Sequence, residues 1–160
     1  FKNHVTANEF LLQPAIVQST PKIAKGENYL QLPYVLLDYP RCFDKENIFT
    51  IRTMFWWGNF FSITLHLSGK YKETFETALQ KNIETLVQHD FYVCINEDEW
   101  QHHFKTDNYM PANKLTLGEI NSITQRHFIK VAIKFPLEKW DTMPLLLEKS
   151  FLDLLQLIRN

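Results

Sequence analysis

The stretch of sequence that most constrains the fold runs from Ile48 to Ser68 and reads IFTIRTMFWWGNFFSITLHLS. It is rich in aromatic and β-branched residues, which favour β-strands. Its one interruption is Gly58-Asn59, a pair typical of tight turns. We therefore expect two antiparallel strands that meet at a short loop.

The register of this hairpin decides which of its side chains are buried. A two-residue loop at Gly58-Asn59 would place Arg52 among aliphatic side chains without a partner, which is costly. A three-residue loop, Gly58-Asn59-Phe60, separates polar from apolar side chains, and it is the register we predict. It places Arg52 directly across from His66 on a polar face. The opposite, apolar face would hold Phe49, Ile51, Thr53, Phe55, Trp57, Phe61, Ile63, Leu65 and Leu67.

The rest of the chain predicts an α+β fold. With 160 residues, 45% of them hydrophobic and 22% charged, we expect one soluble domain spanning 1–160. Alternating and apolar runs predict a single antiparallel or mixed sheet of about five strands, with helices packed on one face. The expected strands lie at about 34–39, 48–57, 61–68, 91–96 and 128–135, and the expected covering helices at 70–89 and 143–158.

Three further segments have weaker patterns. Residues 1–33 predict a short helix within 6–18, opened by a capping box of Thr6 and Glu9 and ended or kinked by Pro14, and then an irregular or extended segment, with a mobile flap as the alternative. A second capping box, Thr116 to Glu119, predicts a helix at 117–127. The polar segment from Glu97 to Asn113 predicts a short helix followed by a loop.

Composition excludes several functions. Four glycines, with neither G-x-G-x-x-G nor G-x-x-x-x-G-K-[ST], predict no mononucleotide or dinucleotide site, and we expect no cofactor. Seventeen basic and eighteen acidic residues without a basic block predict no binding to nucleic acid. No apolar run is long enough for a membrane span. Two distant cysteines, Cys42 and Cys94, are typical of free thiols in a reducing compartment, so we expect a cytoplasmic protein.

The polar face of the hairpin is the first candidate site. An arginine that can bind a carboxylate or phosphate, a histidine, hydroxyl groups and a tryptophan could together bind a small anionic or aromatic ligand. The outer face of a half-exposed sheet would carry similar residues for solubility alone. The candidate ligand-binding residues are Arg52, His66, Trp56, Thr64, Thr50, Asp38 and Arg41.

The second candidate is a metal site at Glu99, His102 and His103. On a helix, both histidines would share a face with the carboxylate. A solvated acidic helix with surface histidines explains the same pattern. Since the chain has only one such E-x-x-H motif, we expect no metal.

No catalytic motif is present, so the sequence favours a non-catalytic binding or interaction module over an enzyme. The alternative is a small hydrolase or transferase in which Arg52 holds an anionic substrate and His66 acts as acid or base, inside a cleft. The partner would be another protein or a small ligand. The leucine-rich stripe of the last helix also allows a homodimer as an alternative to packing on the sheet.

Overall fold

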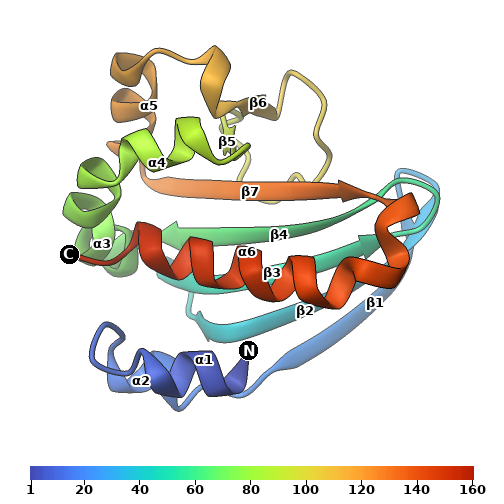
Figure 1. Ribbon diagram of the computed structural model, residues 1–160, viewed down its shortest axis with the longest axis horizontal. Helices are drawn as coiled ribbons and strands as arrows, with labels where there is room; N and C mark the ends of the chain where they lie inside the picture. Colours follow the sequence, from blue (N-terminus) through green and yellow to red (C-terminus); the bar gives the residue numbers. More distant parts are fainter.

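The computed structural model describes residues 1–160 and has an α+β fold built on one antiparallel sheet (Figure 1). The sheet has seven strands in the order β1-β2-β3-β4-β7-β5-β6, so the class that we predicted is confirmed and the number of strands is larger. The strands are β1 (Lys22–Tyr29), β2 (Leu32–Phe43), β3 (Ile48–Trp56), β4 (Phe60–Ser68), β5 (Tyr92–Cys94), β6 (Tyr109–Pro111) and β7 (Phe128–Pro136).

Helices cover one face of this sheet, and the long terminal helix crosses it (Figure 1). This helix, α6, buries Phe151, Leu154 and Leu155 in the main core against β4, so its apolar stripe is used within the chain. The α-helices are α1 (Lys2–Ala7), α2 (Pro14–Val17), α3 (Gly69–Lys81), α4 (Ile83–Gln88), α5 (Leu117–Thr124) and α6 (Met143–Leu157). Two 3-10 helices complete the set, η1 (Ala112–Lys114) and η2 (Leu137–Thr142).

The central hairpin has the two faces that the sequence predicts, but a different register. Trp56 pairs with Phe60, so the three-residue loop begins at Trp57, one residue earlier than expected. Arg52 is opposite Thr64 rather than His66, and the predicted direct pairing of Arg52 with His66 is therefore wrong. The shift is two residues, which leaves the paired side chains on their predicted faces because side chains alternate along a strand. Trp57 is the exception, since it lies in the loop and is 52% exposed rather than part of the core.

Interactions at the loop explain this register. The N–H of Asn59 donates to the carbonyl oxygen of Trp56 at 3.1 Å, which closes the turn one residue early. The N–H of Trp57 donates to Pro33 in the adjacent strand β2 at 3.0 Å, so Trp57 is bound outside the hairpin ladder. Gly58 has a φ of 69°, a left-handed conformation that suits glycine.

Strand β1 lies where the sequence predicts an irregular segment. It pairs with β2 at the edge of the sheet, and its side chains are largely exposed. An edge strand that is exposed on both faces lacks the apolar alternation that identifies strands, and its lysines are typical of protected edges. Strand β2 is also longer than the expected 34–39, because it passes Pro40 through a register shift between Asp38 and Arg41.

The two predicted capping boxes have different outcomes. Thr116 and Glu119 form a complete capping box at the start of α5, as expected. Thr6 lies in the last turn of α1, which begins at Lys2, so it caps nothing. The predicted start of the helix at Thr6 is wrong, and Pro14, which is predicted to end or kink it, begins α2. Docking of the first residues sets this boundary, because the ring of Phe1 stacks on Phe151 with centroids 4.4 Å apart.

Two other predicted helices also change. The single helix expected at 70–89 is divided at Asn82 into α3 and α4, where the Asn82 side-chain amide donates to the Arg159 carbonyl oxygen at 2.9 Å. The short helix expected after Glu97 is absent, and residues 95–108 form a loop instead. We call residues 95–108 the covering loop, because they lie over the sheet face opposite α3 and α6.

Replacing Gly69 with alanine should lower the free energy of unfolding by about 2 kcal/mol. Gly69 has a φ of 54°, and an added methyl group would lie 2.6 Å from the Glu46 carbonyl oxygen. Urea unfolding measures the effect. The matched control is Gly118→Ala in α5, where nothing lies closer than 3.9 Å and the change should be neutral or stabilising. Equal losses in both variants would contradict the argument.

Candidate functional site

The predicted binding face of the hairpin is buried. His66 is 3% exposed, Asp38 6% and Thr64 8%, because the covering loop lies on them. The loop closes at its base, where the N–H of Ile95 donates to the Asn108 carbonyl oxygen at 2.8 Å. The two candidate sites that the sequence suggests separately, the hairpin face and the Glu99–His103 segment, are thus packed against each other.

Asp38 and Arg52 form a buried ion pair at the centre of this interface. They are direct partners in the β2–β3 register. Nε and Nη2 of Arg52 donate to the two carboxylate oxygens of Asp38 at 2.7 and 2.8 Å, a two-point contact that fixes both side chains. Nη1 of Arg52 points to Nε2 of His102 at 3.5 Å. The guanidinium group is therefore engaged within the protein.

His66 is held by Glu99 from the covering loop. Nε2 of His66 lies 2.7 Å from a carboxylate oxygen of Glu99, which accepts the hydrogen bond. Burial lowers the pKa of His66, and the nearby Lys130 and Arg52 cations act in the same direction, against the effect of Glu99. The contact with His66 lowers the pKa of Glu99. Both shifts favour a neutral imidazole that donates to a carboxylate.

Lys130 and Tyr29 anchor the covering loop to the sheet. Nζ of Lys130, on β7, donates to the carbonyl oxygens of Glu99 and Gln101 at 2.8 and 2.6 Å. Burial lowers the pKa of Lys130 to about 8. The Tyr29 hydroxyl accepts the backbone N–H groups of His102 and His103 at 2.9 and 3.1 Å. The sequence identified neither residue as an anchor. For Lys130 the reason is the alternation in β7, which predicts that this side chain is exposed to solvent.

Three other predicted ligand-binding residues make few polar contacts. The indole N–H of Trp56 and the hydroxyl of Thr50 are buried without a hydrogen-bond partner. The Trp56 ring packs on Tyr29, with centroids 5.2 Å apart. Arg41 is opposite Thr50, but its guanidinium stacks on Phe43 at 4.9 Å and does not join the Asp38–Arg52 pair.

The three residues of the predicted metal site do not converge. Glu99 binds His66, His102 faces Arg52, and the nearest acid to His103 is Asp107 at 3.9 Å. No group of three histidine, cysteine or acidic side chains in the structure could hold a metal ion. The spacing argument fails here because it assumes a helix, and the covering loop is not helical.

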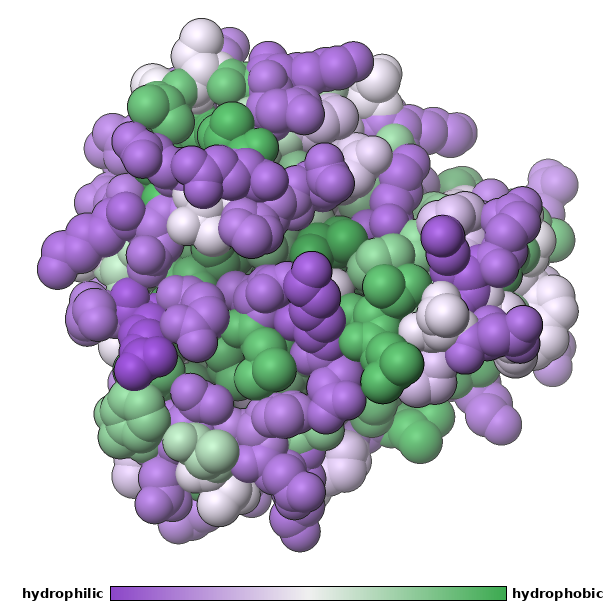
Figure 2. All heavy atoms as spheres, in the orientation of Figure 1, coloured by the Kyte–Doolittle hydropathy of each residue, from purple (hydrophilic) through white to green (hydrophobic).

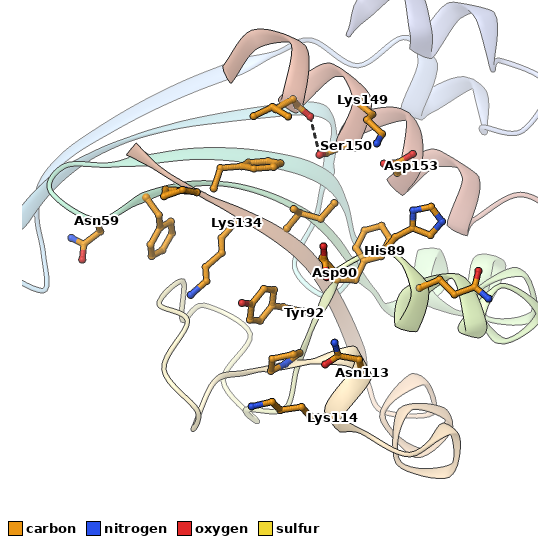
Figure 3. A pocket seen from close by; sticks show the side chains of 18 residues that line it. Asn59, His89, Asp90, Tyr92, Asn113, Lys114, Lys134, Lys149, Ser150 and Asp153 are labelled. Atoms are coloured by element: carbon orange, nitrogen blue, oxygen red, sulfur yellow. Dashed lines mark hydrogen bonds between the residues drawn. The ribbon is translucent and has the colours of Figure 1, made fainter. Parts of the chain in front are cut away.

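An open cavity lies elsewhere, along one edge of β7 beside α6. It is a groove of about 800 Å³, and Figure 3 shows its side chains. Figure 2 shows hydrophobic side chains gathered across the middle of the α6 face, within a largely hydrophilic surface. The groove is lined by Asn59, Phe60, Gln88, His89, Asp90, Phe91, Tyr92, Pro111, Asn113, Lys114, Ile133, Lys134, Phe135, Pro136, Leu146, Lys149, Ser150 and Asp153.

The lining is mostly polar and includes charged side chains without ion-pair partners. It contains three lysines, Lys114, Lys134 and Lys149, and two aspartates, Asp90 and Asp153, and none of these five side chains forms a salt bridge or hydrogen bond. Nζ of Lys134 lies 5.2 Å from the Tyr92 ring centroid, over the ring (Figure 3). The hydroxyl of Ser150 donates to its own helix at Leu146.

These features define an α+β protein with a closed polar layer on one sheet face and an open groove at a strand edge. Comparisons of the chain with family models, with curated proteins and with solved structures found no match. No helix has the combination of length and hydrophobicity that crossing a membrane requires.

Proposed function

We propose that this protein is a binding module whose ligand occupies the groove along the edge of β7. The observation that carries the proposal is the groove itself, about 800 Å³ with charged side chains that form no salt bridge or hydrogen bond inside the protein. Its volume lies within the range of ligand sites, and its lining is more polar than that of a typical small-molecule pocket, with six hydrophobic residues among eighteen.

The contrast with the hairpin face supports this choice of site. There, Arg52 is bound by Asp38 and His66 by Glu99, so a ligand would have to displace the covering loop and break these contacts. Binding or catalysis by Arg52 and His66 stays a prediction that requires the loop to open. The groove needs no such rearrangement, and for this reason we favour binding over hydrolysis or group transfer.

A screen of small-molecule fragments tests the proposal. Two-dimensional amide NMR spectra should show saturable shifts concentrated at groove residues such as Tyr92, Lys134 and Ser150. Shifts concentrated at the exposed Trp57 and Trp140, or in the covering loop, would place the site elsewhere. A screen without any specific shift would contradict a binding function.

A pair of leucine variants in α6 provides the matched control. Leu146→Trp should fill the groove and weaken fragment binding about tenfold or more, which corresponds to about 1.4 kcal/mol. Leu145→Trp places the same side chain one residue away on an exposed position, 71% accessible, outside the groove. Binding should be unchanged in Leu145→Trp, and equal loss in both variants would contradict the assignment.

A further inference from the structure

The groove follows the free edge of a β-strand. Ile133 and Phe135 turn to the helix side of β7, where they pack with the main core. Lys134 turns to the other side, over the rings of Tyr92 and Phe104. Side chains from both faces of β7 thus line the same cavity. The cavity therefore runs along the backbone of β7 at the edge of the strand.

The edge is free because β5 leaves β7 early. Strand β4 pairs with β7 along its whole length, to Pro136. On the other side β5 pairs only with Val131 and Ala132. Residues 133–136 therefore have a neighbouring strand on one side and none on the other, and an edge of this kind can accept another strand.

Local structure diverts the chain before β5 can extend this pairing. Asp90 has a φ of 48°, a left-handed turn just before the strand. The carbonyl oxygen of Phe91 accepts the N–H of Ala112 at 2.8 Å, so it is used on the β6 side. These two features keep β5 from pairing with β7 beyond Ala132, so the edge of β7 stays free from Ile133 onward.

We propose that the ligand of the groove is an extended peptide segment, which adds to the sheet as a strand beside residues 133–136. Such a segment would form backbone hydrogen bonds with β7, a recurrent mode of peptide recognition. This inference rests on the proposed binding function and specifies the class of ligand.

The groove also predicts the pattern of the peptide. Alternate residues of an added strand point to opposite faces of the sheet. On the helix side they meet Ile133, Phe135 and Leu146, which suit apolar side chains. On the other side they meet Lys134, whose charge has no acidic partner in the protein and suits aspartate or glutamate. The preferred sequence alternates apolar and acidic residues.

A synthetic probe tests this directly. It is a fluorescein-labelled hexapeptide of alternating valine and glutamate, acetylated and amidated at its ends, and binding is followed by fluorescence anisotropy. Methylating the alternate backbone nitrogens that face β7 should weaken binding at least tenfold, since each lost hydrogen bond is worth about 1 kcal/mol and more than one is lost. Replacing the glutamates with lysine should weaken it at least as much.

Charge reversal on the protein supplies the second arm. Lys134→Glu should weaken binding of the peptide about fivefold or more. The change replaces the attraction between Lys134 and the glutamates of the peptide with a repulsion between like charges. The matched control is Lys139→Glu in η2, another exposed lysine that lies outside the groove, where affinity should be unchanged.

Three outcomes would overturn the inference: no binding of the probe, equal affinity after N-methylation, or equal effects of the two lysine reversals. Fragments that still shift the groove residues would then leave the binding function standing and remove only the peptide as its ligand. Failure of both the fragments and the peptide would remove the binding function as well.

Discussion

Replacing Asp38 with alanine is expected to lower the free energy of unfolding by about 3–5 kcal/mol. The side chains of Asp38 and Arg52 are only 8% and 13% exposed, and two short hydrogen bonds join them. Removing the carboxylate leaves a guanidinium cation in a poorly solvated place with no counter-ion. The penalty comes mainly from this unpaired charge rather than from the lost attraction.

A double-mutant cycle in urea separates these two contributions. Asp38→Leu combined with Arg52→Met removes both charges and keeps apolar volume, so it should be much less destabilising than Asp38→Ala alone. The exposed pair of His4 and Glu148 is the control, because Glu148 is 50% exposed and Glu148→Ala should cost less than about 1 kcal/mol. A loss that small for Asp38→Ala would show that the buried pair is solvated.

The hairpin shows how far the sequence can specify this fold. Its polar and apolar side chains alternate, and burying Arg52 without a partner was enough to reject one of two registers. The remaining ambiguity was a shift of two residues, which exchanges no side chain between faces and so has no signal in hydrophobicity. Only contacts with β2, such as the bond from Trp57 to Pro33, distinguish these two alternatives.

The covering loop could not be predicted in the same way. The alternation in β7 predicts a solvent-facing side made of Lys130, Ala132 and Lys134. In the structure Lys130 and Ala132 are 2% and 0% exposed, while Lys134 remains exposed. The difference arises because residues 95–108 cover only part of the strand. The alternation of polar and apolar residues predicts which side chains of a strand share a face. It does not predict whether a distant loop covers that face.

The groove has no sequence signature for a related reason. Its lining comes from five separate parts of the chain, namely the hairpin loop, the turn before β5, the end of β6, the end of β7 and α6. No two of its lysines are close in sequence, and each has an ordinary surface spacing. What brings them together is the early departure of β5 from β7, which depends on the turn at Asp90.

Acidification should destabilise this protein before its carboxylates titrate. Burial, with Lys130, Arg52 and His66 nearby, lowers the pKa of His102 to about 3, and burial also lowers the pKa of His66. His102 therefore stays neutral in the fold at a pH where the unfolded chain, with a histidine pKa of about 6.5, binds a proton, and the lowered pKa of His66 acts in the same direction. The unfolded state therefore takes up more protons as pH falls, and the stabilisation present above pH 6.5 is lost progressively below it.

The size of this effect follows from proton linkage. A histidine that stays neutral in the fold contributes up to about 1.4 kcal/mol per pH unit below pH 6.5. Through His102 alone, unfolding in urea should become about 2 kcal/mol easier between pH 7 and pH 5, and the lowered pKa of His66 adds to this effect. His102→Gln keeps an acceptor for Arg52 without the titration, and should flatten the pH dependence while pH 5 stability rises relative to the wild type. The same change at the exposed His89 is the control, and should leave the slope intact. A wild-type stability that is constant from pH 7 to pH 5 would contradict this prediction and would mean that water and protons already pass the covering loop. Binding or catalysis at Arg52 and His66 would require the same opening of the loop.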